Sequence, residues 1–504
     1  MSRTTISTGS FSLDASADKK ASTKRPDAFN ESAGSSIKKS EHCHMVFLAD
    51  FSGRGHRGLN DASGIQTRKI IEVDRDTFDE VFAQMDVRCA LPMADEISFS
   101  ELDDMHPDYL YEHIDLFNKF RSLRKKLKNP ATFASAAQEI YAWHSDRQVP
   151  VSDTSQESRP EATDGAGSLL DSILSGAEPA SSNGMDLQAL VKEIVAPFVT
   201  PKPDPQQKEL IETVDQAASD LMRKIMHHPQ FQTIESAWRS LYLLVRRLET
   251  DSKLKLFMVD VSQQELIDDA LSCDAYKQTQ LYKLLVDRQS AIGGKTFNVI
   301  MADAIFGEQE DDIAALSQLG KLAASSDALL VTGGSIKLAG CEDLAKTPDR
   351  DDWSFSHADE VKKVWHSLRE MEQAANIIAV APRYLTRMPY GKKSAPIDSF
   401  HFEELPDSGR HGYYLWSNGS WLLSLVLAQG FSINGDITKQ SVQEIERLPL
   451  HVYTEDDESV VTPCAEVNML DAAASAFYQS GLTVVRTVLN KDSVMIPEII
   501  SLAI

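Results

Sequence analysis

The second half of the chain repeats one pattern, in which a short apolar run precedes a longer stretch whose apolar residues recur every three or four positions. The short runs predict buried strands, and the longer periodic stretches predict helices. Strands and helices that alternate in this way predict an α/β fold, mixed α+β in detail, with a largely parallel or mixed sheet flanked by helices. The predicted strands are 254–259, 297–301, 329–332, 377–381 and 483–489, and the predicted helices are 263–271, 279–286, 313–324, 359–374, 420–429 and 471–478.

A long amphipathic helix begins at Pro229, ahead of these strands, and follows another predicted helix at 206–226. Proline suits the first turn of a helix, where its missing N–H has no partner to lose. The apolar residues recur at helical spacing, and the charged residues are predicted to lie off that face. The apolar residues are Phe231, Ile234, Trp238, Leu241, Val245 and Leu248, and the charged ones are Glu235, Arg239, Arg246 and Arg247.

Composition divides the chain into four parts. Residues 1–42 are rich in Ser, Thr, Lys and Asp and predict a disordered arm, because such a segment buries too little surface to offset the entropy of ordering. Residues 43–144 form a first globular region, 145–205 a Ser-, Gly- and Pro-rich flexible linker with a short apolar helix at 168–174, and 206–504 a second globular region.

The first globular region has its own predicted elements. Strands are expected at 45–49, 69–73 and 97–99. Asp76 is expected to cap a helix that carries Phe78. Pro107 is expected to open a longer helix that reaches Leu127, with several lysines and arginines near its end, where cations suit the helix dipole.

Several uncommon residues of the second region stand in an order that resembles the large, VipB-like (TssC-like) subunit of the type VI secretion contractile sheath. The blocks extend over roughly three hundred residues, which is far more specific than one short motif. The residues that carry the resemblance are His228, Pro229, Phe231, Glu235, Trp238, Arg239, Trp365, Arg369, Pro382, Arg383, Arg387, Pro389, Tyr390, Gly391 and Trp416.

The first region resembles the small, VipA-like (TssB-like) subunit of the same sheath over about eighty residues. The matching blocks are 47–54, 68–69, 73–76, 78–81, 99, 102–104 and 107. The chain therefore looks like a small subunit joined to a large one. The resemblance implies a structural component of the sheath that takes part in contraction-driven secretion. Its implied partners are other sheath subunits, the inner tube protein and the baseplate.

The short helix at 168–174 has two interpretations. It can be a strip that docks on the chain's own surface. The resemblance instead implies a helix that the AAA+ disassembly ATPase binds after contraction, with Leu169, Leu170, Ile173 and Leu174 as its anchors. An alternative function for the whole chain is an adaptor that binds that ATPase through this helix and never enters a sheath.

The sequence stops at Ile504, where the resembled family continues with a tail that carries an arm for strand exchange with a neighbour. We therefore expect either an ordinary subunit or an accessory element that caps the sheath or adapts it to the baseplate. Such an element would accept a neighbour's strand without donating its own.

Charge and cysteine content narrow the remaining functions. The net charge of −24 argues against a nucleic-acid groove, which needs a basic surface. Five scattered cysteines without a CxxC pair suit a reducing cytoplasm. No secretory signal and no apolar run long enough to span a membrane are visible, so a cytoplasmic location is expected.

No catalytic or cofactor motif is complete. The run from Gly293 to Thr296 lacks the glycine that a phosphate-binding loop needs at position 289, which is Gln289. His42, Cys43 and His44 have no second ligand pair nearby, so a chance cluster is the simpler interpretation. We therefore expect no enzyme activity, no cofactor and no metal. The remaining enzyme hypothesis is a ligand at the carboxyl ends of the predicted strands.

Overall fold

The structure is a computed structural model that describes residues 41–92, 94–145, 207–291, 294, 296–353, 359–405, 411–439, 444–455 and 457–504. Nearly all of the predicted arm 1–42, and the linker 145–205 apart from Ser145, lie outside these residues. The predicted helix 168–174, with Leu169, Leu170, Ile173 and Leu174, lies outside them as well.

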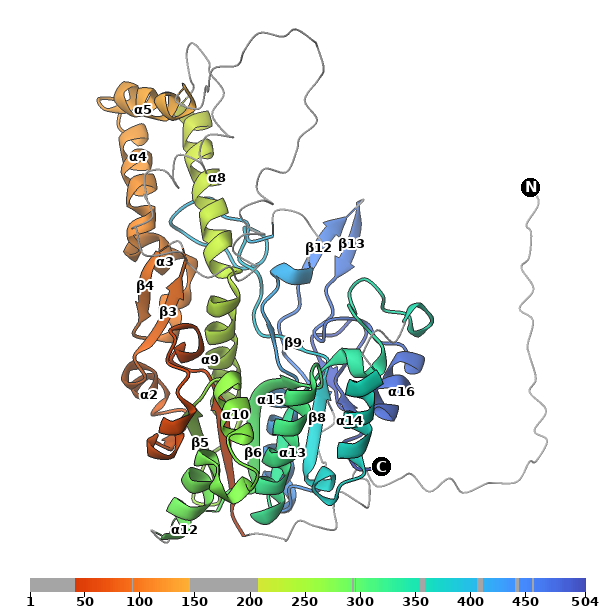
Figure 1. The fold of residues 1–504 in the computed structure, drawn as a ribbon. Coiled ribbons are helices and arrows are strands. Elements are labelled where there is room, and N and C mark those ends of the chain that lie inside the picture. The colour runs from red at the N-terminus through yellow and green to blue at the C-terminus, as the bar shows by residue number, and fades with distance from the viewer. Residues whose placement is uncertain are drawn as a thin grey trace, which may run out of the picture.

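One seven-stranded sheet runs through the molecule in the order β14-β8-β7-β6-β1-β5-β2 (Figure 1). Neighbouring strands are parallel except at one end, where β2 runs antiparallel to β5. The prediction of an α/β fold with a mixed sheet is confirmed. The strands are β1 (Cys43–Ala49), β2 (Ile71–Val73), β5 (Leu254–Asp260), β6 (Val299–Phe306), β7 (Leu329–Gly334), β8 (Ile377–Ala381) and β14 (Leu482–Val484).

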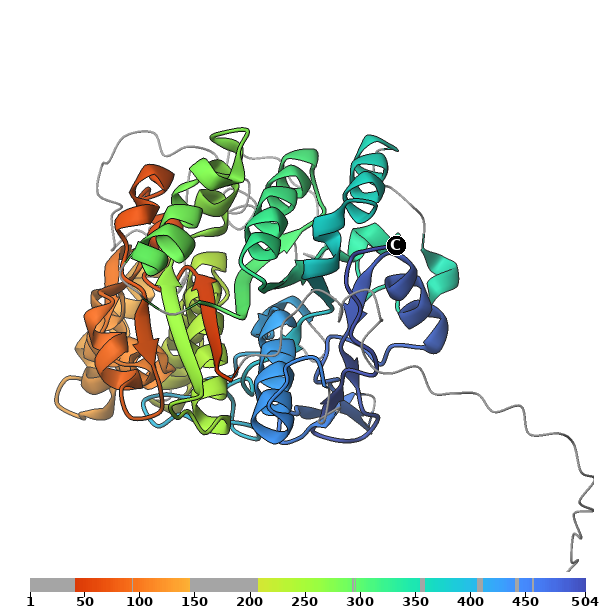
Figure 2. The same ribbon diagram turned by 90° about the horizontal axis from the view of Figure 1, so that it is seen from below.

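Helices cover both faces of this sheet (Figure 1, Figure 2). Because side chains alternate along a strand, β1 contributes to two cores. Met45 and Phe47 pack with α9 and α15, whereas Val46 and Leu48 pack with α10 and α13. The helices of the first face are α9 (Pro229–Arg247) and α15 (Ser420–Asn434), and those of the second are α10 (Gln263–Leu271), α13 (Glu310–Ser325), α14 (Asp359–Arg369) and α16 (Asp471–Gln479).

The first region extends beyond β1 as a column beside α8 (Gln207–Met226) and α9 (Figure 1). Helix α4 packs on α8, and the hairpin of β3 and β4 packs on α9. The elements of the column are α2 (Phe78–Gln84), β3 (Val87–Leu91), β4 (Ala94–Phe99), α3 (Pro107–His113), α4 (Asn118–Lys128) and α5 (Phe133–Ser145).

Short elements complete the described chain. Three small antiparallel sheets pair β9 with β10, β12 with β13, and β16 with both β11 and β15. Helices α11 (Gln280–Tyr282) and α12 (Arg288–Ala291) flank a π-helical turn, Lys283–Asp287. The strands are β9 (Tyr384–Leu385), β10 (Trp416–Ser417), β11 (Glu444–Ile445), β12 (Val452–Glu455), β13 (Glu458–Val461), β15 (Arg486–Thr487) and β16 (Val494–Met495).

Some predicted elements of the first region differ from the structure for local reasons. The helix predicted from Pro107 to Leu127 is broken, because Ile114 takes an extended conformation with ψ of 132°. Asp76 is not the cap of α2; the side chain of Asp74 accepts the backbone N–H groups of Asp76 and Thr77 instead. The sequence pattern also does not predict β3 or α5.

In the second region, the predicted helix 359–374 ends as an α-helix at Arg369 and continues only as a 3-10 turn, Glu372–Asn376. The predicted strand 483–489 is also divided. Its first residues form β14 of the main sheet, and Arg486–Thr487 pairs as β15 with β16 in a separate sheet.

Candidate functional site at the seam between residues 41–145 and 207–504

Strand β1 joins the two regions, because residues 41–145 supply it and residues 207–504 supply both of its neighbours. Cys43 lies opposite Leu254 of β5, and Met45 lies opposite Val299 of β6. A strand between two parallel neighbours forms backbone hydrogen bonds along both of its edges. The central sheet of 207–504 is therefore complete only when a strand of 41–145 fills the space between β5 and β6.

Asp260, the last residue of β5, holds the loop that leaves β1. Its Oδ1 accepts the backbone N–H groups of Phe51 and Ser52, both at 3.0 Å, and its Oδ2 accepts the Ser52 hydroxyl at 2.7 Å. Gly53 has a φ of 77°, and a Cβ at this position would lie 2.1 Å from the carbonyl oxygen of Arg88. Position 53 therefore requires glycine both for its conformation and for its close approach to β3.

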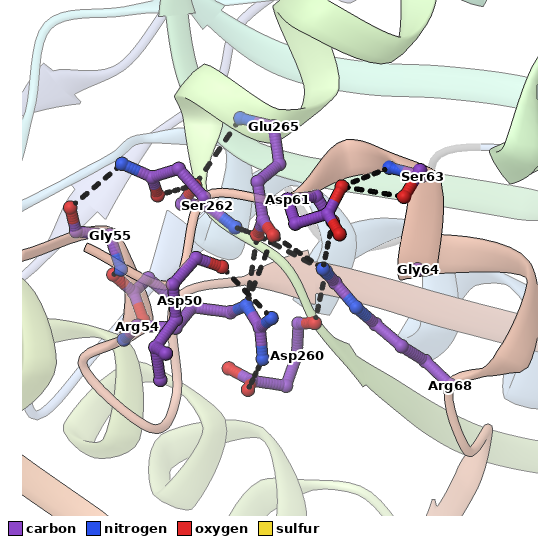
Figure 3. A network of polar contacts seen from close by, with 12 residues as sticks. Asp50, Arg54, Gly55, Asp61, Ser63, Gly64, Arg68, Asp260, Ser262 and Glu265 are labelled. Atoms are coloured by element: carbon purple, nitrogen blue, oxygen red, sulfur yellow. Dashed lines mark hydrogen bonds and ion pairs between the residues drawn. The ribbon is translucent and has the colours of Figure 1, made fainter. Parts of the chain in front are cut away.

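Two arginines of the first region converge on Glu265 of α10 (Figure 3). Arg54 donates from Nε to Glu265 Oε2 at 3.0 Å and from Nη1 to Asp260 Oδ2 at 3.2 Å. Arg68 donates from Nη1 to Glu265 Oε2 at 3.1 Å and from Nη2 to Oε1. The Glu265 side chain is fully buried, so the two guanidinium groups balance a charge that has no access to water. We call Asp50, Arg54, Arg68, Asp260 and Glu265 the latch.

The carboxylates of the latch differ in their affinity for protons. Burial by itself raises the pKa of Glu265, but hydrogen bonds from Arg68 and the Ser262 amide, and the charges of both arginines, hold it below its usual value. Asp50 accepts the amides of Arg54 and Gly55, yet burial and then the charge of Asp260 raise its pKa to about 6. The Asp50 carboxyl is held by backbone amides, and its burial together with the nearby charge of Asp260 favours a proton on it.

An aromatic cluster lies beside the latch. Trp238 of α9 is fully buried, and its indole Nε1 donates to the carbonyl oxygen of Phe51 at 2.8 Å. The rings of Phe51, Phe78 and Phe82 lie with their centroids 5.2, 5.6 and 4.4 Å from that of Trp238. The predicted core residue Trp238 thus packs against the first region from the second.

Other predicted residues meet in a buried ion-pair cluster inside the second region. Arg387 donates from Nε to Glu235 Oε1 at 2.7 Å and from Nη1 to Glu404 Oε2 at 2.7 Å. Arg239 donates to Glu235 at 2.7 Å and to the Tyr390 hydroxyl at 3.1 Å. We call Glu235, Arg239, Arg387, Tyr390 and Glu404 the core cluster. The prediction that Glu235 lies off the buried face is wrong, because Arg387 gives its carboxylate a partner on that side.

The remaining predicted residues lie at element ends and in nearby loops. His228 caps α9 by accepting the Gln230 amide at Nδ1, and Phe231 packs against Phe99 with ring centroids 6.0 Å apart. The others are Pro229 at the first position of α9, Arg369 bonded to the carbonyls of Gln479 and Leu502, Pro382 in a cis peptide bond, Arg383 paired with Glu466, Pro389 and Gly391 in the loop after β9, and Trp416 in β10.

A second connection between the regions comes from residues 389–405, which we call the strap. Asp108 of α3 accepts the backbone N–H of Ser399 at 2.8 Å and that of Asp398 at 3.1 Å. Arg124 of α4 donates to the Ser399 carbonyl at 2.6 Å and to Asp215 of α8 at 2.7 Å. The core cluster holds both ends of the strap, because the backbone N–H of Tyr390 at its start donates to the Glu404 carboxylate near its end, so the two networks are physically continuous.

Sequence reasoning did not single out Asp260, Glu265 or Asp108. One local signal was present, because Ser262 and Glu265 have the spacing of a capping box, and the structure forms that box. The box marks a helix start and says nothing about arginines some two hundred residues away. Only the folded sheet brings those arginines to Glu265.

The structure gives little support to the hypotheses of an enzyme site and of a metal site. Doubly wound sheets bind ligands at the carboxyl ends of their strands. In this sheet the side chain of Asn418, just before α15, covers those ends of β6 and β7. Its Nδ2 donates to the carbonyl oxygen of Ala304 at 3.0 Å, and a Cβ on Gly333 would lie 2.7 Å from that nitrogen. A cavity beside Phe297 and Ser326 measures about 50 Å³, against roughly 300–1,000 Å³ for ligand pockets.

For the metal hypothesis, Cys43 is buried in β1, and its neighbour His44 has Nδ1 3.0 Å from the Thr296 carbonyl. In the part of the chain that the structure describes, no group of three or more His, Cys, Asp or Glu side chains could hold a metal ion. Two of the residues between Gly293 and Thr296 lie outside that part. No helix among the described residues is long and apolar enough to cross a membrane.

The latch and the strap join residues 41–145 to residues 207–504, and the core cluster joins segments of the second region, so the structure is that of a protein built from two interlocked parts. Comparison with known families gives the same answer. Residues 208–502 match the family described as EvpB/VC_A0108, tail sheath N-terminal domain, and residues 29–140 match that described as type VI secretion system, VipA, VC_A0107 or Hcp2. The chain belongs to the type VI secretion system tail sheath family, a family of structural proteins and not of enzymes.

The type VI secretion system sheath protein TssC1 of Pseudomonas aeruginosa is 27% identical to this chain over 282 residues. The match covers 54% of this chain and 57% of that relative, so the chain spans little more than half of the relative's length. The predicted resemblances to the large and the small sheath subunit are confirmed, each in the region where the sequence placed it.

Proposed function

We propose that this protein is a single-chain sheath protomer, which takes with one polypeptide the place that a small and a large subunit would share. In this role it works in the cytoplasm and assembles with other sheath subunits around the inner tube. The observation that carries the proposal is the position of β1. A strand of the small-subunit-like region lies in the middle of the sheet, so the two regions move as one body.

This construction suits a part that transmits force. Open head-to-tail contacts between copies generate a helical tube, and a contractile tube does work by passing between two packings of the same subunits. Each subunit must then keep its shape while its contacts change. The seam supplies that stiffness through backbone pairing of β1 on both sides, the latch and the strap.

The hairpin of β12 and β13 supports a tethering role. Among the described strands it pairs with no third one, and Val452 on it is 49% exposed. Isolated two-stranded hairpins are only marginally stable, and a free edge can accept a strand from another chain. We infer that this hairpin receives a strand of a neighbouring subunit, which keeps neighbours linked during contraction.

Co-expression with a complete sheath pair, followed by electron microscopy of the labelled protein, tests this function. Uniform labelling along the sheath indicates an ordinary subunit, and labelling at one end indicates a capping or baseplate-proximal element. Val460→Pro, which breaks the hairpin, should reduce incorporation strongly, whereas Val460→Thr keeps a strand-forming residue and should not. A protein that is absent from sheaths of every length contradicts the proposal.

The alternative function, an adaptor for the AAA+ disassembly ATPase, depends on residues 168–174. Their spacing of leucine and isoleucine suits a helix that enters an apolar groove. Deletion of residues 168–174 should abolish capture of the ATPase if the protein is such an adaptor, and the intact protein should then be absent from sheaths. Loss of capture in a protein that never enters a sheath would favour the adaptor over the protomer.

A further inference from the structure

The contacts of the seam differ in how much sequence information they carry. Strand β1 pairs with β5 and β6 through its backbone, and most sequences with strand propensity can form such bonds. The latch is different, because Glu265 is matched by the guanidinium groups of two particular side chains, Arg54 and Arg68. Selection of the segment that fills the slot between β5 and β6 must therefore come largely from side chains such as these.

We propose that Glu265 and Asp260 select the segment that completes the central sheet, accepting a small-subunit-type segment with arginines at positions 54 and 68. The inference deepens the proposed protomer function, because it names the residues that decide which partner segment is used. The same residues occur in every copy of this chain, so a second copy is the partner that fits the slot in trans.

The energetic basis of the selection is the burial of Glu265. Its carboxylate is 0% exposed, and a buried charge that loses its partner is strongly destabilising, whereas a satisfied pair contributes little net stability. A strand donor without the two arginines would leave that charge unmatched. Glu265 thus acts mainly by excluding wrong segments.

Asp260 adds a requirement on backbone shape. It accepts the amides of Phe51 and Ser52 with one carboxylate oxygen, and the following residue, Gly53, has a left-handed conformation. A residue with a Cβ there would meet the Arg88 carbonyl. The two carboxylates on β5 and α10 therefore hold the loop amides and the arginines together, whereas the requirement for glycine at position 53 comes from β3 of the first region.

A double-mutant cycle on the full chain tests the conditional penalty. Arg68→Met alone should lower the melting temperature by about 5 °C, because it removes one of two partners of a buried charge. In a Glu265→Gln background the same substitution should lower it by less than about 1 °C, because no unmatched charge remains. Additive effects of the two substitutions would overturn the proposal.

Arg57→Met is the matched control. Arg57 forms an ion pair with Glu96 inside the first region, and its side chain is 17% exposed. Arg57→Met therefore also removes an arginine from an arginine–glutamate pair, but this pair does not connect the two regions. Its effect on the melting temperature should be equal in the wild-type and Glu265→Gln backgrounds. A difference between the backgrounds as large as that of Arg68→Met would show that the cycle does not report on the seam.

A cross-link shows directly which copy occupies the slot. Cys43 lies opposite Leu254, and strands about 4.8 Å apart are within the Cα separation that a disulfide requires. An acceptor copy carrying Cys43→Ser, Leu254→Cys and Cys273→Ser is refolded with a donor copy carrying Cys273→Ser alone, at high concentration, and then oxidised. A covalent dimer forms only when the donor's β1 has entered the acceptor's sheet.

The donor with intact arginines should give at least about tenfold more dimer than a donor carrying Arg54→Met and Arg68→Met, since about 1.4 kcal/mol corresponds to a factor of ten. Glu265→Gln in the acceptor should remove most of this preference. Equal yields from both donors would overturn the selection, and no dimer from either would overturn the second copy as partner. Both tests use isolated protein, so they give a result even if the protein does not enter sheaths.

Discussion

The latch and the core cluster are built from the same parts and differ in what they connect. Each contains two arginines that share buried carboxylates. In the core cluster, Arg387 is 8% exposed and lies between two glutamates of the second region. In the latch, Arg54 and Arg68 are 20% and 11% exposed and reach from the first region to Glu265 in the second. One network fixes the inside of a region, and the other fixes two regions to each other.

The balance of charge also differs. The core cluster has two carboxylates for two arginines. Burial alone would raise the pKa of Glu404, but the charge of Arg387 outweighs burial and lowers this pKa to about 2. The latch has one carboxylate more than it has arginines, and Asp50 holds a pKa of about 6. Of the two networks, the latch is therefore the one that can respond to a change of pH near 6.

The largest expected effect of any single change is in the core cluster. Arg387→Met leaves Glu235 and Glu404 buried without their shared partner, so we expect a loss of about 3–5 kcal/mol in the free energy of unfolding. Urea unfolding of the purified protein measures it. Lys346→Met is the control, because this 82% exposed lysine pairs only at the surface with Asp343 and should matter little. Equal effects of the two substitutions would contradict the comparison.

The loop that leaves β1 should give the next largest effect. Gly53→Ala adds a Cβ that would lie 2.1 Å from the Arg88 carbonyl and places alanine at a φ of 77°, for a cost of about 2–4 kcal/mol. Gly58→Ala has a similar φ of 68° but meets nothing within 4 Å, so only the conformational part, about 1 kcal/mol, should remain. Thermal unfolding of both variants separates the close contact from the conformational strain.

The contrast between the networks also shows what sequence can predict. The core cluster consists largely of residues that the sheath resemblance marks, such as Arg387 and Tyr390, so sequence alone singled out most of its members without predicting that they meet. The burial of Glu235 in this cluster was not predicted, because helical periodicity placed that residue on the polar face. A charged residue can be buried when a distant segment supplies its partner, and periodicity within one helix contains no information about that segment.

The seam was harder to predict for a topological reason. Alternating strands and helices predicted the α/β class, and the apolar run after Cys43 predicted β1. Nothing in either pattern says that β1 lies between β5 and β6, two strands that follow it by about two hundred residues or more. Asp260 and Glu265 look like an ordinary strand end and helix start until that order is known. Their role depends on long-range strand pairing, which local propensity does not determine.

The third expected effect is a dependence on pH. Because the folded protein raises the pKa of Asp50 to about 6 from its usual 3.8, the contribution of this group to stability is present at low pH and lost as pH rises through about 6. Asp50→Asn removes the titration, so its stability relative to wild type should rise by about 1.4 kcal/mol between pH 5 and pH 8. Urea unfolding across that range measures the difference.

Ser52→Ala controls for local damage to the same loop. It removes the hydroxyl that Asp260 accepts at 2.7 Å and introduces no titratable group. Its stability relative to wild type should stay constant over the same pH range. A constant difference for Asp50→Asn as well would mean that the excess carboxylate of the latch does not take up a proton near pH 6, and the electrostatic contrast with the core cluster would fail.

The smallest expected effect is at the strap, which crosses the seam far from the latch. Asp108→Asn replaces a carboxylate that accepts the amides of Asp398 and Ser399 with a neutral group that accepts less strongly, for a loss of about 1 kcal/mol. Hydrogen exchange should accelerate at these two amides and remain unchanged at Phe51 and Ser52 in the latch. Faster exchange at all four would show that strap and latch open together, and that the seam is one cooperative unit and not two separate fastenings.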